Sequence, residues 1–570
     1  MKLSDYAQWK PAIAIEDMDT TRQPAIIQRK ARKVRDFWLL AVILLASVVS
    51  ISTTIYYYNK NETLLYGDAY SHLIIARRVI DDITPGLDQF GGTWLPLQHI
   101  LMLPFIWNDY LWRTGLAGTI PSMISYVIAA GYLFCTLRRL TKQTATSLIG
   151  VIIFLCNPNI LYLQTTPLTE VMCTAAFAAT AYYLLCWLQE EKSQYLACTA
   201  IATCIATLIR YDGWALFLVV TILVVATGVF RKHNRDMIID QIMVYLSIAP
   251  LGIIFWFIWD IKNFGDPLYF QHGQYSSQAH QLDFIRRGAI PTYHNIWVSF
   301  RVNTIDVGQT IGWGLFVCAL LSLVVILIFY RKRQEYFILA MILTPFVFYV
   351  ASLYLGQSII YLPGAGSQTF FNVRYGAQMV LPAAFLIARV ISPLYYWLRR
   401  WYAKIPLILV CLVCIEAQVT SVNASGVISV QDGLTGLSCI NVTKPIILNL
   451  AQHYNGGKIL VYEETSGLNY PQFFGSHFSN IIWEGSGSYW KNALAHPEKY
   501  VDWVVLNPHN PNDTVSKLFT KNKLEFLSLF KVMSSDSDGL QLYYRTRALP
   551  LPTRPISNDL LSRPNTCKNE

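Results

Sequence analysis

The chain has 570 residues, of which 54% are hydrophobic and 14% are charged, and its formal net charge is +10. Soluble proteins carry about 25% charged residues, and the mean hydropathy here is +0.35. These values exclude an ordinary soluble protein, a disordered chain and a small disulfide scaffold. They predict a polytopic membrane protein with a soluble appendage.

The N-terminal 36 residues are polar and basic, so we expect a cytoplasmic tail at 1–36 and no cleavable signal peptide. Apolar runs of about 18 residues or more can cross the hydrocarbon core of a membrane as helices. Such runs lie near residues 37–58, 115–137, 145–164, 168–188, 240–259, 307–330, 336–356, 373–395 and 405–421. Two shorter runs, 196–209 and 214–230, flank the polar turn Arg210-Tyr211-Asp212-Gly213.

Basic residues in short loops predict the orientation, because cytoplasmic loops carry an excess of Lys and Arg. Besides the tail, four clusters are predicted to lie inside: Arg138-Arg139/Lys142, Arg231-Lys232/Arg235, Arg331-Lys332-Arg333 and Arg399-Arg400/Lys404. Because the tail and Arg138-Arg139 are both predicted to lie inside, the chain must cross the membrane an even number of times between them. The runs 37–58 and 115–137 supply these two crossings, so the run 95–112, which prolines and polar residues interrupt, is predicted to be re-entrant or to lie flat at the interface. The result is a transmembrane region at 37–421 with about eleven crossings, a first outer loop at 59–114 and a long outer loop at 260–306. Inner loops and anionic lipid account for the net charge, so no nucleic-acid partner is expected.

After residue 421 the apolar blocks shorten and charges return. Strands are predicted at Lys458–Tyr462, Asn480–Trp483, Val501–Leu506, Phe526–Val532 and Leu540–Tyr544. Helices are predicted near 445–455, 488–497 and 513–522. This alternation favours an outer α/β domain at 422–548, followed by an extended tail at 549–570. Cys439 and Cys567 are the only cysteines of this part, and a disulfide between them is one possibility that the spacing leaves open.

The first outer loop carries the strongest candidate for chemistry. Asp68, in Gly67-Asp68-Ala69-Tyr70-Ser71-His72, is predicted to cap an amphipathic helix at about 69–83. We expect this helix to lie at the membrane interface. Its shared apolar face consists of Leu73, Ala76, Val79 and Ile80. Asp68 is then either a simple helix cap or a catalytic carboxylate.

Glu170 starts a predicted span on the same outer face. It is either a first-turn carboxylate favoured by the helix dipole or a partner for Asp68, since two carboxylates can act as general base and partner. Basic residues on the outer side are few: Lys262 follows a span, Arg374 opens one, and Arg210 lies in the turn between two short helices. Ionisable residues at such depth are functional candidates, and Arg suits phosphate. The alternative is contact between these side chains and lipid headgroups.

The long outer loop is rich in His, Gln and Tyr, which can hydrogen-bond hydroxyls or stack on a sugar. His272 is the candidate there, although a lid or an ordinary loop would have the same composition. The turn at Arg210 is weakly similar to an aspartate-containing signature of oligosaccharyltransferases. Because the turn lies between membrane helices, we interpret that similarity as coincidence. The sequence contains no P-loop, Rossmann fingerprint or HExxH motif, and we expect neither a metal nor a cofactor.

The order of these features resembles a known family. A cytoplasmic start and one span are followed by the conspicuous segments Gly67-Asp68, Trp94-Leu95-Pro96-Leu97, Glu170, Arg374-Tyr375 and Leu381-Pro382. Over about residues 37–400 the chain resembles the GT-C glycosyltransferases that use lipid-phosphate-linked sugars, such as protein O-mannosyltransferases and the aminoarabinose transferases of lipid A. The resemblance implies inverting transfer of a sugar from a polyprenyl-phosphate carrier to an acceptor hydroxyl at the outer face.

The resemblance also implies roles for matching positions. Asp68 matches the first-loop aspartate that acts as general base, and Glu170 matches a second-loop acidic residue that contacts substrate. The remaining expected substrate contacts are Arg374, Lys262, Arg210, His272 and Tyr375. Many members pair two acidic residues in the first loop, whereas Ala69 follows Asp68 here. The subfamily, the sugar and the acceptor, which could be a glycan, lipid or protein, therefore stay open.

Other classes of protein compete with this interpretation. A transporter or lipid flippase would usually show internal repeats, and none is clear here. A surface-polysaccharide polymerase or ligase shares the lipid-carrier chemistry, and a receptor or scaffold would make the charged helix ends incidental. Convergence of Asp68, Glu170 and Arg374 on one cavity would favour the transferase. Without a signal peptide or retention signal, the bacterial plasma membrane is favoured over the endoplasmic reticulum.

Overall fold

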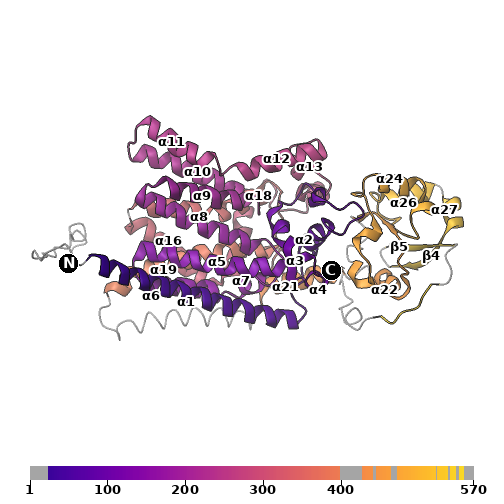
Figure 1. Ribbon diagram of the computed structural model, residues 1–570, viewed down its shortest axis with the longest axis horizontal. Coiled ribbons are helices and arrows are strands. Elements are labelled where there is room, and N and C mark those ends of the chain that lie inside the picture. Colours follow the sequence, from indigo (N-terminus) through magenta and orange to yellow (C-terminus); the bar gives the residue numbers. More distant parts are fainter. Residues whose placement is uncertain are drawn as a thin grey trace, which may run out of the picture.

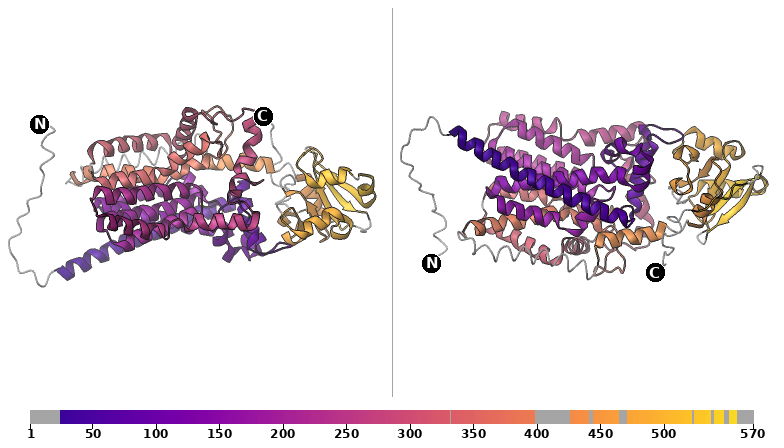
Figure 2. Two further views of the ribbon diagram at one scale, coloured as in Figure 1. Left: turned by 90° about the horizontal axis from the view of Figure 1, so that it is seen from above. Right: turned by 60° about the horizontal axis from the view of Figure 1, so that its bottom comes forward.

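The computed structural model describes residues 24–330, 332–397, 426–440, 444–463, 471–521, 523–536, 539–546 and 551–556. The described chain is a bundle of mostly parallel or antiparallel helices with a small sheet at one end (Figure 1). The first helix, α1, runs obliquely across the bundle, and its N-terminal end lies farthest from the sheet (Figure 2).

Within the described residues, five helices are long and apolar enough to cross a membrane, or up to eight if each of three bent pairs is one span. The five are α1 (Pro24–Asn59), α5 (Leu116–Thr141), α8 (Glu170–Glu190), α10 (Asp212–Phe230) and the run formed by η3 (Val373–Met379) and α19 (Val380–Trp397). The bent pairs are α11 (Arg235–Leu246) with α12 (Leu251–Phe264), α15 (Ile296–Ile311) with α16 (Trp313–Phe329), and α17 (Arg333–Ile342) with α18 (Thr344–Tyr354). The chain is thus a multi-pass membrane protein. The total of about eleven crossings stays a prediction, and the predicted span 405–421 lies outside the described residues.

Two predicted single spans are broken by identifiable residues. The run 307–330 bends by 113° between α15 and α16 at Gly312, whose φ of +93° suits glycine. The run 145–164 divides into α6 (Thr144–Leu155) and α7 (Pro158–Leu163) because the Asn157 side chain caps α7 by accepting from two backbone N–H groups. The run 196–209 forms α9 (Ser193–Thr207), and 95–112 forms the short helices α3 (Leu97–Ile106) and α4 (Asp109–Thr114).

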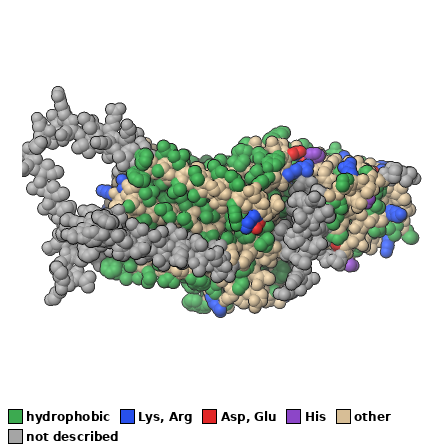
Figure 3. Space-filling model, turned by 90° about the horizontal axis from the view of Figure 1, so that it is seen from below, with side chains coloured by type: hydrophobic (Ala, Val, Ile, Leu, Met, Phe, Trp, Pro, Cys, Tyr) green, Lys and Arg blue, Asp and Glu red, His purple; other side chains and the backbone are tan. Residues whose placement is uncertain are grey.

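Apolar side chains both fill the bundle and cover its outside. α5 packs against α1, α6 and α8, and α9 packs against α8 and α10. Large apolar side chains such as Val48, Leu218 and Ile222 are more than half exposed. Figure 3 shows such side chains over much of the helical part. An exposed apolar surface of this extent suits contact with lipid tails.

The predicted first outer loop, residues 59–114, contains α2 (Gly67–Arg78), which differs from the predicted interfacial helix at 69–83. Tyr66 is the N-cap, so Asp68 lies in the first helical turn and does not cap it. Most of α2 is buried in the protein, including Arg77 and Arg78. Arg77 binds Asp109 of α4 at 2.7 Å. The polar face of α2 therefore contacts protein partners that are distant in the sequence.

The C-terminal part contains a five-stranded mixed sheet in the order β2-β1-β3-β5-β4. β1 (Ile459–Val461) pairs in parallel with β2 (Ile481–Ile482) and β3 (Trp503–Leu506), and β5 (Gln541–Arg545) pairs antiparallel with β3 and β4 (Phe530–Ser535). The helices of this part are α21 (Ile428–Ile440), α22 (Lys444–His453), α24 (Ser488–Ala495), α25 (Pro497–Tyr500), α26 (Thr514–Lys521) and α27 (Lys523–Leu529). The shorter helices of the loops are η2 (Leu87–Phe90), α13 (Tyr269–His272), α14 (Ser277–Arg286), η6 (Pro471–Phe474) and η7 (Phe478–Asn480).

The alternation of side chains along β1 places its residues in two different cores. Ile459 and Val461 pack with α22 and with Tyr70 of α2, whereas Leu460 packs with Phe519 and Phe526 of α26 and α27. One face of the sheet therefore shares its core with α2.

Each predicted strand overlaps an observed one. Residues 526–529, predicted as part of a strand, form the last turn of α27, and β4 continues beyond the predicted end to Ser535. The domain limits 422–548 and their location outside the membrane stay predictions. The possible disulfide between Cys439 and Cys567 and most of the tail 549–570 lie outside the described residues and side chains.

Candidate functional site

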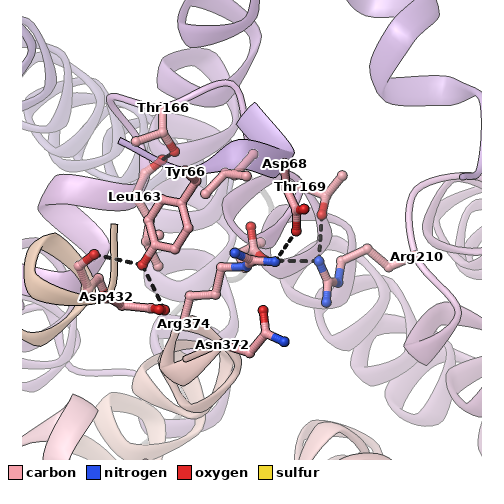
Figure 4. A network of polar contacts seen from close by, with 12 residues as sticks. Tyr66, Asp68, Leu163, Thr166, Thr169, Arg210, Asn372, Arg374 and Asp432 are labelled. Atoms are coloured by element: carbon pink, nitrogen blue, oxygen red, sulfur yellow. Dashed lines mark hydrogen bonds and ion pairs between the residues drawn. The ribbon is translucent and has the colours of Figure 1, made fainter. Parts of the chain in front are cut away.

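Five ionisable side chains meet where four helices begin, and together they form the arginine–carboxylate cluster: Asp68, Glu170, Arg210, Asp212 and Arg374. Figure 4 shows the guanidinium groups of Arg210 and Arg374 approaching from opposite sides. The three carboxylates lie in the first turns of α2, α8 and α10. The positive end of a helix dipole stabilises a carboxylate there.

Arg374 joins Asp68 to Glu170. Its Nε donates to Glu170 Oε1 at 3.0 Å, and its Nη2 donates to Asp68 Oδ2. The Arg374 side chain is only 6% exposed, whereas that of Asp68 is 41% exposed. Asn372, in the left-handed conformation with φ of +57°, turns the chain into η3 just before Arg374.

Arg210 is the second arginine that binds Glu170. Its Nη1 donates to Glu170 Oε1 at 3.0 Å and also to Thr169 Oγ1, and its Nη2 donates to Tyr349 Oη at 2.6 Å. Its Nε lies 3.5 Å from Asp212 Oδ2. The planar guanidinium thus binds four groups from three segments, a geometry for which Lys is a poor substitute.

Charge in the cluster is closely balanced. Glu170 Oε1 accepts from both guanidiniums, while Oε2 has no hydrogen-bond partner among the described residues. Two guanidiniums face three carboxylates, so each cation is already paired. An arriving anion must therefore compete with a carboxylate for its guanidinium.

Aromatic rings surround the two guanidiniums. The Arg374 guanidinium lies 4.9 Å from the Tyr66 ring centre, and that of Arg210 lies 5.4 Å from the Tyr375 ring centre. The rings of Tyr349 and Tyr375 stack at 4.7 Å. These contacts strengthen as water is excluded, and they restrict the orientation of both arginines.

Tyr66 connects the cluster to α21. Its hydroxyl donates to the Ser429 carbonyl at 2.6 Å and to Asp432 Oδ2 at 3.1 Å. Asp432 also accepts from the Val373 backbone N–H at 3.2 Å, beside Arg374. Burial raises the pKa of Asp432 to about 6, against the opposing effect of Arg374.

A buried histidine pair lies close to Asp68 in the sequence of α2. His72, one turn after Asp68 in α2, lies with its Nδ1 2.9 Å from Nε2 of His99 in α3. Burial lowers the pKa of His72 to about 3, and the charges of Arg374 and Arg210 add to this effect. His72 is therefore neutral at physiological pH and fixes α2 against α3 without adding charge to the cluster.

A cavity of about 1290 Å³ opens beside the cluster. Asp68, Asn372 and Tyr375 line it together with residues from other segments, including Gln89, Gln281 and Glu484. Glu170, Arg210 and Arg374 are not among the described residues that line it. Asp68 is thus the member of the cluster that faces the cavity.

The structure brings together Asp68, Glu170, Arg210, Arg374 and Tyr375 of the predicted site residues. Lys262 and His272 lie apart from them. Lys262 is exposed on the last turn of α12, and His272 is exposed with its Nδ1 3.3 Å from Asp266 Oδ2. Neither is among the described residues that line the cavity.

Sequence reasoning missed several members of the site: Tyr66, Thr169, Asp212, Tyr349 and Asp432. Asp212 carried a usable signal, since a carboxylate beside Arg210 at the start of an apolar helix is unusual in a membrane. Interpreting that turn as a chance similarity hid the ion pair. Among the described residues there is no group of three or more His, Cys, Asp or Glu side chains that could hold a metal ion.

The chain is similar to known proteins in sequence and in fold. Residues 112–259 match a family described as "Dolichyl-phosphate-mannose-protein mannosyltransferase". No curated protein sequence matches the chain. The chain is similar to the crystal structure of ArnT from Cupriavidus metallidurans bound to undecaprenyl phosphate, with 13% identity, a TM-score of 0.51, and coverage of 90% of this chain and 98% of that one.

Two further structures match with lower scores. ArnT from the same organism in the apo state has 12% identity and a TM-score of 0.47, covering 90% of this chain and 98% of that one. The Archaeoglobus fulgidus oligosaccharyltransferase, tethered to an acceptor peptide containing the NVT sequon, has 11% identity and a TM-score of 0.42, covering 93% of this chain and 77% of that one.

These findings confirm the resemblance predicted from the sequence, and the chain has the fold of ArnT. At such low identity the likeness concerns the fold and does not transfer residue roles. The family match covers Glu170, Arg210 and Asp212, whereas Asp68 and Arg374 lie outside it. The roles of the site residues must therefore be argued from their own geometry.

Proposed function

We propose that the protein is a membrane glycosyltransferase that moves a sugar from a polyprenyl-phosphate carrier to an acceptor hydroxyl. One observation carries the proposal: Asp68 faces a large cavity while bound to the buried Arg374, on a fold similar to that of ArnT. The meeting of Asp68, Glu170 and Arg374 supports an enzyme over a transporter or scaffold, because those classes do not require these side chains to converge.

Arg374 is the proposed site for the donor phosphate. A guanidinium can bind two phosphate oxygens side by side, but Arg374 already binds Asp68 and Glu170. A phosphate that takes the Nη2 side of Arg374 displaces the partly exposed Asp68 more easily than the buried Glu170. Donor binding then releases Asp68 from its cation and makes it a stronger base.

Bond making and breaking follow from this arrangement. The acceptor oxygen attacks the anomeric carbon from the side opposite the phosphate, and its proton passes to Asp68. The bond between the anomeric carbon and the phosphate oxygen breaks, and the electron pair leaves with polyprenyl phosphate. The sugar is inverted. Arg374 stabilises the negative charge that develops on the leaving phosphate.

Glu170, Arg210 and Tyr375 position the reacting groups in this scheme. Glu170 fixes both guanidiniums through one oxygen, and Arg210 anchors Glu170 to Thr169 and Tyr349. Lys262 and His272, which lie outside the cluster, are assigned no step. The distribution of basic loops supports an outer-face location for the cluster, and a bacterial plasma membrane is the proposed location.

The proposal is tested with purified protein, a panel of polyprenyl-phosphate sugars and a mixture of hydroxyl acceptors. We expect release of polyprenyl phosphate with at least one donor, and a higher donor KM for Arg374→Ala. Arg389→Ala is the matched control. Arg389 is also a mostly buried arginine and pairs with a carboxylate, Glu335, at 2.6 Å, but it is not part of the cluster. No release from any donor, or equal donor dependence in both variants, would refute the assignment.

A further inference from the structure

Helix α15 carries polar side chains inside the protein and apolar side chains outside. Ser299, Asn303 and Thr310 are buried, and their hydrogen bonds go to protein carbonyls. The opposite side, which we call the α15 apolar face, consists of Ile296, Trp297 and Phe300. Ile296 and Phe300 are about half exposed, and Trp297 is 79% exposed. A helix that faces water has the reverse arrangement, so the α15 apolar face is suited to an apolar environment.

The bend at Gly312 sets the direction of α15 relative to the bundle. Beyond the bend, α16 exposes Val317, Leu321 and Ile328 and leads to a basic cluster that is predicted to lie inside. The bend of 113° turns α15 nearly perpendicular to α16. With α16 across the membrane, α15 therefore lies close to the membrane plane, at the predicted outer surface.

The neighbours of the α15 apolar face favour lipid as its occupant. Trp297 near the start of α15 and Trp313 at the start of α16 are both exposed. Tryptophan is enriched where a membrane meets water, because its ring is apolar and its N–H is polar. The chain also continues directly from α15 into the exposed apolar surface of α16, which is suited to lipid tails. The same lipid layer can therefore cover both surfaces.

Arg301 adds a positive charge to this surface. It follows Trp297 by four residues, so the two side chains share a face of α15. Arg301 is exposed, and its Nη2 donates to the Gly364 carbonyl at 3.5 Å. Among the described residues it forms no ion pair, and Asp306, the acidic residue of α15, is buried. An uncompensated guanidinium at a membrane surface is complementary to a headgroup phosphate.

The buried side of α15 connects this surface to the arginine–carboxylate cluster. α15 packs against η3, which contains Arg374. Thr310 Oγ1 donates to the Val373 carbonyl at 3.3 Å, and Val302 shares a small core with Val373. The depth of α15 in the membrane therefore fixes the depth of η3.

We propose that α15 lies in the predicted outer surface of the membrane, with Ile296, Trp297 and Phe300 among lipid chains and Arg301 on a phospholipid phosphate. The contact goes beyond the proposed function and does not depend on it, because these four residues are outside the cluster and are not among the described residues that line the cavity. Through η3 it holds Arg374 near the level of the lipid phosphates.

Photo-crosslinking tests the lipid contact in the full-length protein, placed in nanodiscs of phosphatidylcholine and phosphatidylglycerol. Photoreactive benzoylphenylalanine replaces Trp297, and mass spectrometry identifies what it captures on irradiation. Leu321 of α16 is the positive control. Leu524 of α27 is the negative control, because it is 90% exposed but belongs to the part of the chain that contains the sheet. We expect phospholipid adducts at positions 297 and 321 and none at 524.

The other outcomes of this experiment each overturn the proposal. Adducts at 321 without adducts at 297 would mean that water covers the α15 apolar face. Cross-links between two protein copies at 297 would assign the face to a second copy of the chain. Equal lipid capture at 297 and 524 would show that exposure alone explains the adducts.

A matched pair of arginine variants tests the phosphate contact. Arg301→Gln should retain about fivefold less phosphatidylglycerol in native mass spectrometry, the effect of one basic side chain near an anionic headgroup. Arg554→Gln is the control, because Arg554 is exposed and its backbone N–H donates to Gln452 in the part of the chain that contains the sheet. Unchanged retention in Arg301→Gln, or an equal loss in both variants, would contradict the assigned contact.

Discussion

Replacing Glu170 with Gln removes one buried charge from the centre of the arginine–carboxylate cluster. Oε1 of Glu170 accepts from Arg210 Nη1 and from Arg374 Nε, both at 3.0 Å, and the side chain is only 2% exposed. Gln keeps one carbonyl oxygen of similar position but offers no charge. Both guanidiniums then lose the anion that they share.

The size of the effect follows from these contacts. Each hydrogen bond to a charged group contributes about 1.5–3 kcal/mol, and removing one partner of a buried ion pair costs about 3–5 kcal/mol. Because the Gln carbonyl can still accept a hydrogen bond, we expect Glu170→Gln to lower the free energy of unfolding by about 3 kcal/mol, the lower end of that range. A displaced Arg374 should also reduce transfer at least tenfold, since small errors of position slow reactions strongly.

Glu335→Gln provides the matched control. Glu335 is similarly buried and binds Arg389 through both oxygens, at 2.6 and 2.9 Å, but it lies apart from the cluster. Thermal unfolding and release of polyprenyl phosphate are measured for both variants at equal protein amounts. Both should lose stability, and only Glu170→Gln should lose transfer. Equal loss of transfer in the two variants would refute a specific role for Glu170.

Two further predictions concern the sheet and pH. Gly485→Ala should lower the unfolding temperature, because a Cβ at Gly485 would lie 2.2 Å from the Trp483 ring. That ring packs against the Arg78 guanidinium, with 3.9 Å between the guanidinium carbon and the ring centre. An unchanged unfolding temperature would contradict this packing. The raised pKa of Asp432, about 6, favours the folded state below about pH 4, and this contribution disappears as pH rises through 6. From pH 4 to pH 7 the free energy of unfolding of the wild type should therefore fall by up to about 3 kcal/mol through this group, whereas that of Asp432→Asn should not show this fall. Parallel pH profiles of the two proteins would refute the raised pKa.

Much of the site could be predicted because charged groups are costly in a membrane. Asp68, Glu170 and Arg374 were identifiable as carboxylates and cations beside apolar helices, and the structure places them in contact. Asp432 could not be identified in this way. Its contact with Tyr66 joins residues 366 positions apart, and no local pattern reports such a pairing.

The fold shows the same division between local and distant information. Apolar runs located the long helices, but the 113° bend at Gly312 was not predicted, because the predicted span 307–330 continues through that residue. The amphipathic pattern of α2 indicated a face for lipid, yet Arg78 is buried against Glu463, which is 385 positions away. Phe526 shows the converse case, since its apolar neighbours suggested a strand, whereas Phe526 packs on Phe519 from the short helix α27.

The transfer activity of Asp68→Asn tests the central claim most directly. Asn keeps the size of the side chain and can still accept a hydrogen bond from Arg374, but it cannot take the acceptor proton. Release of polyprenyl phosphate should therefore fall by about 10²–10⁴-fold, while the amount of folded protein stays unchanged. Asp88→Asn is the control, because Asp88 is an exposed carboxylate that lines the same cavity. Near-normal release in folded Asp68→Asn protein, or an equal loss in Asp88→Asn, would contradict the account.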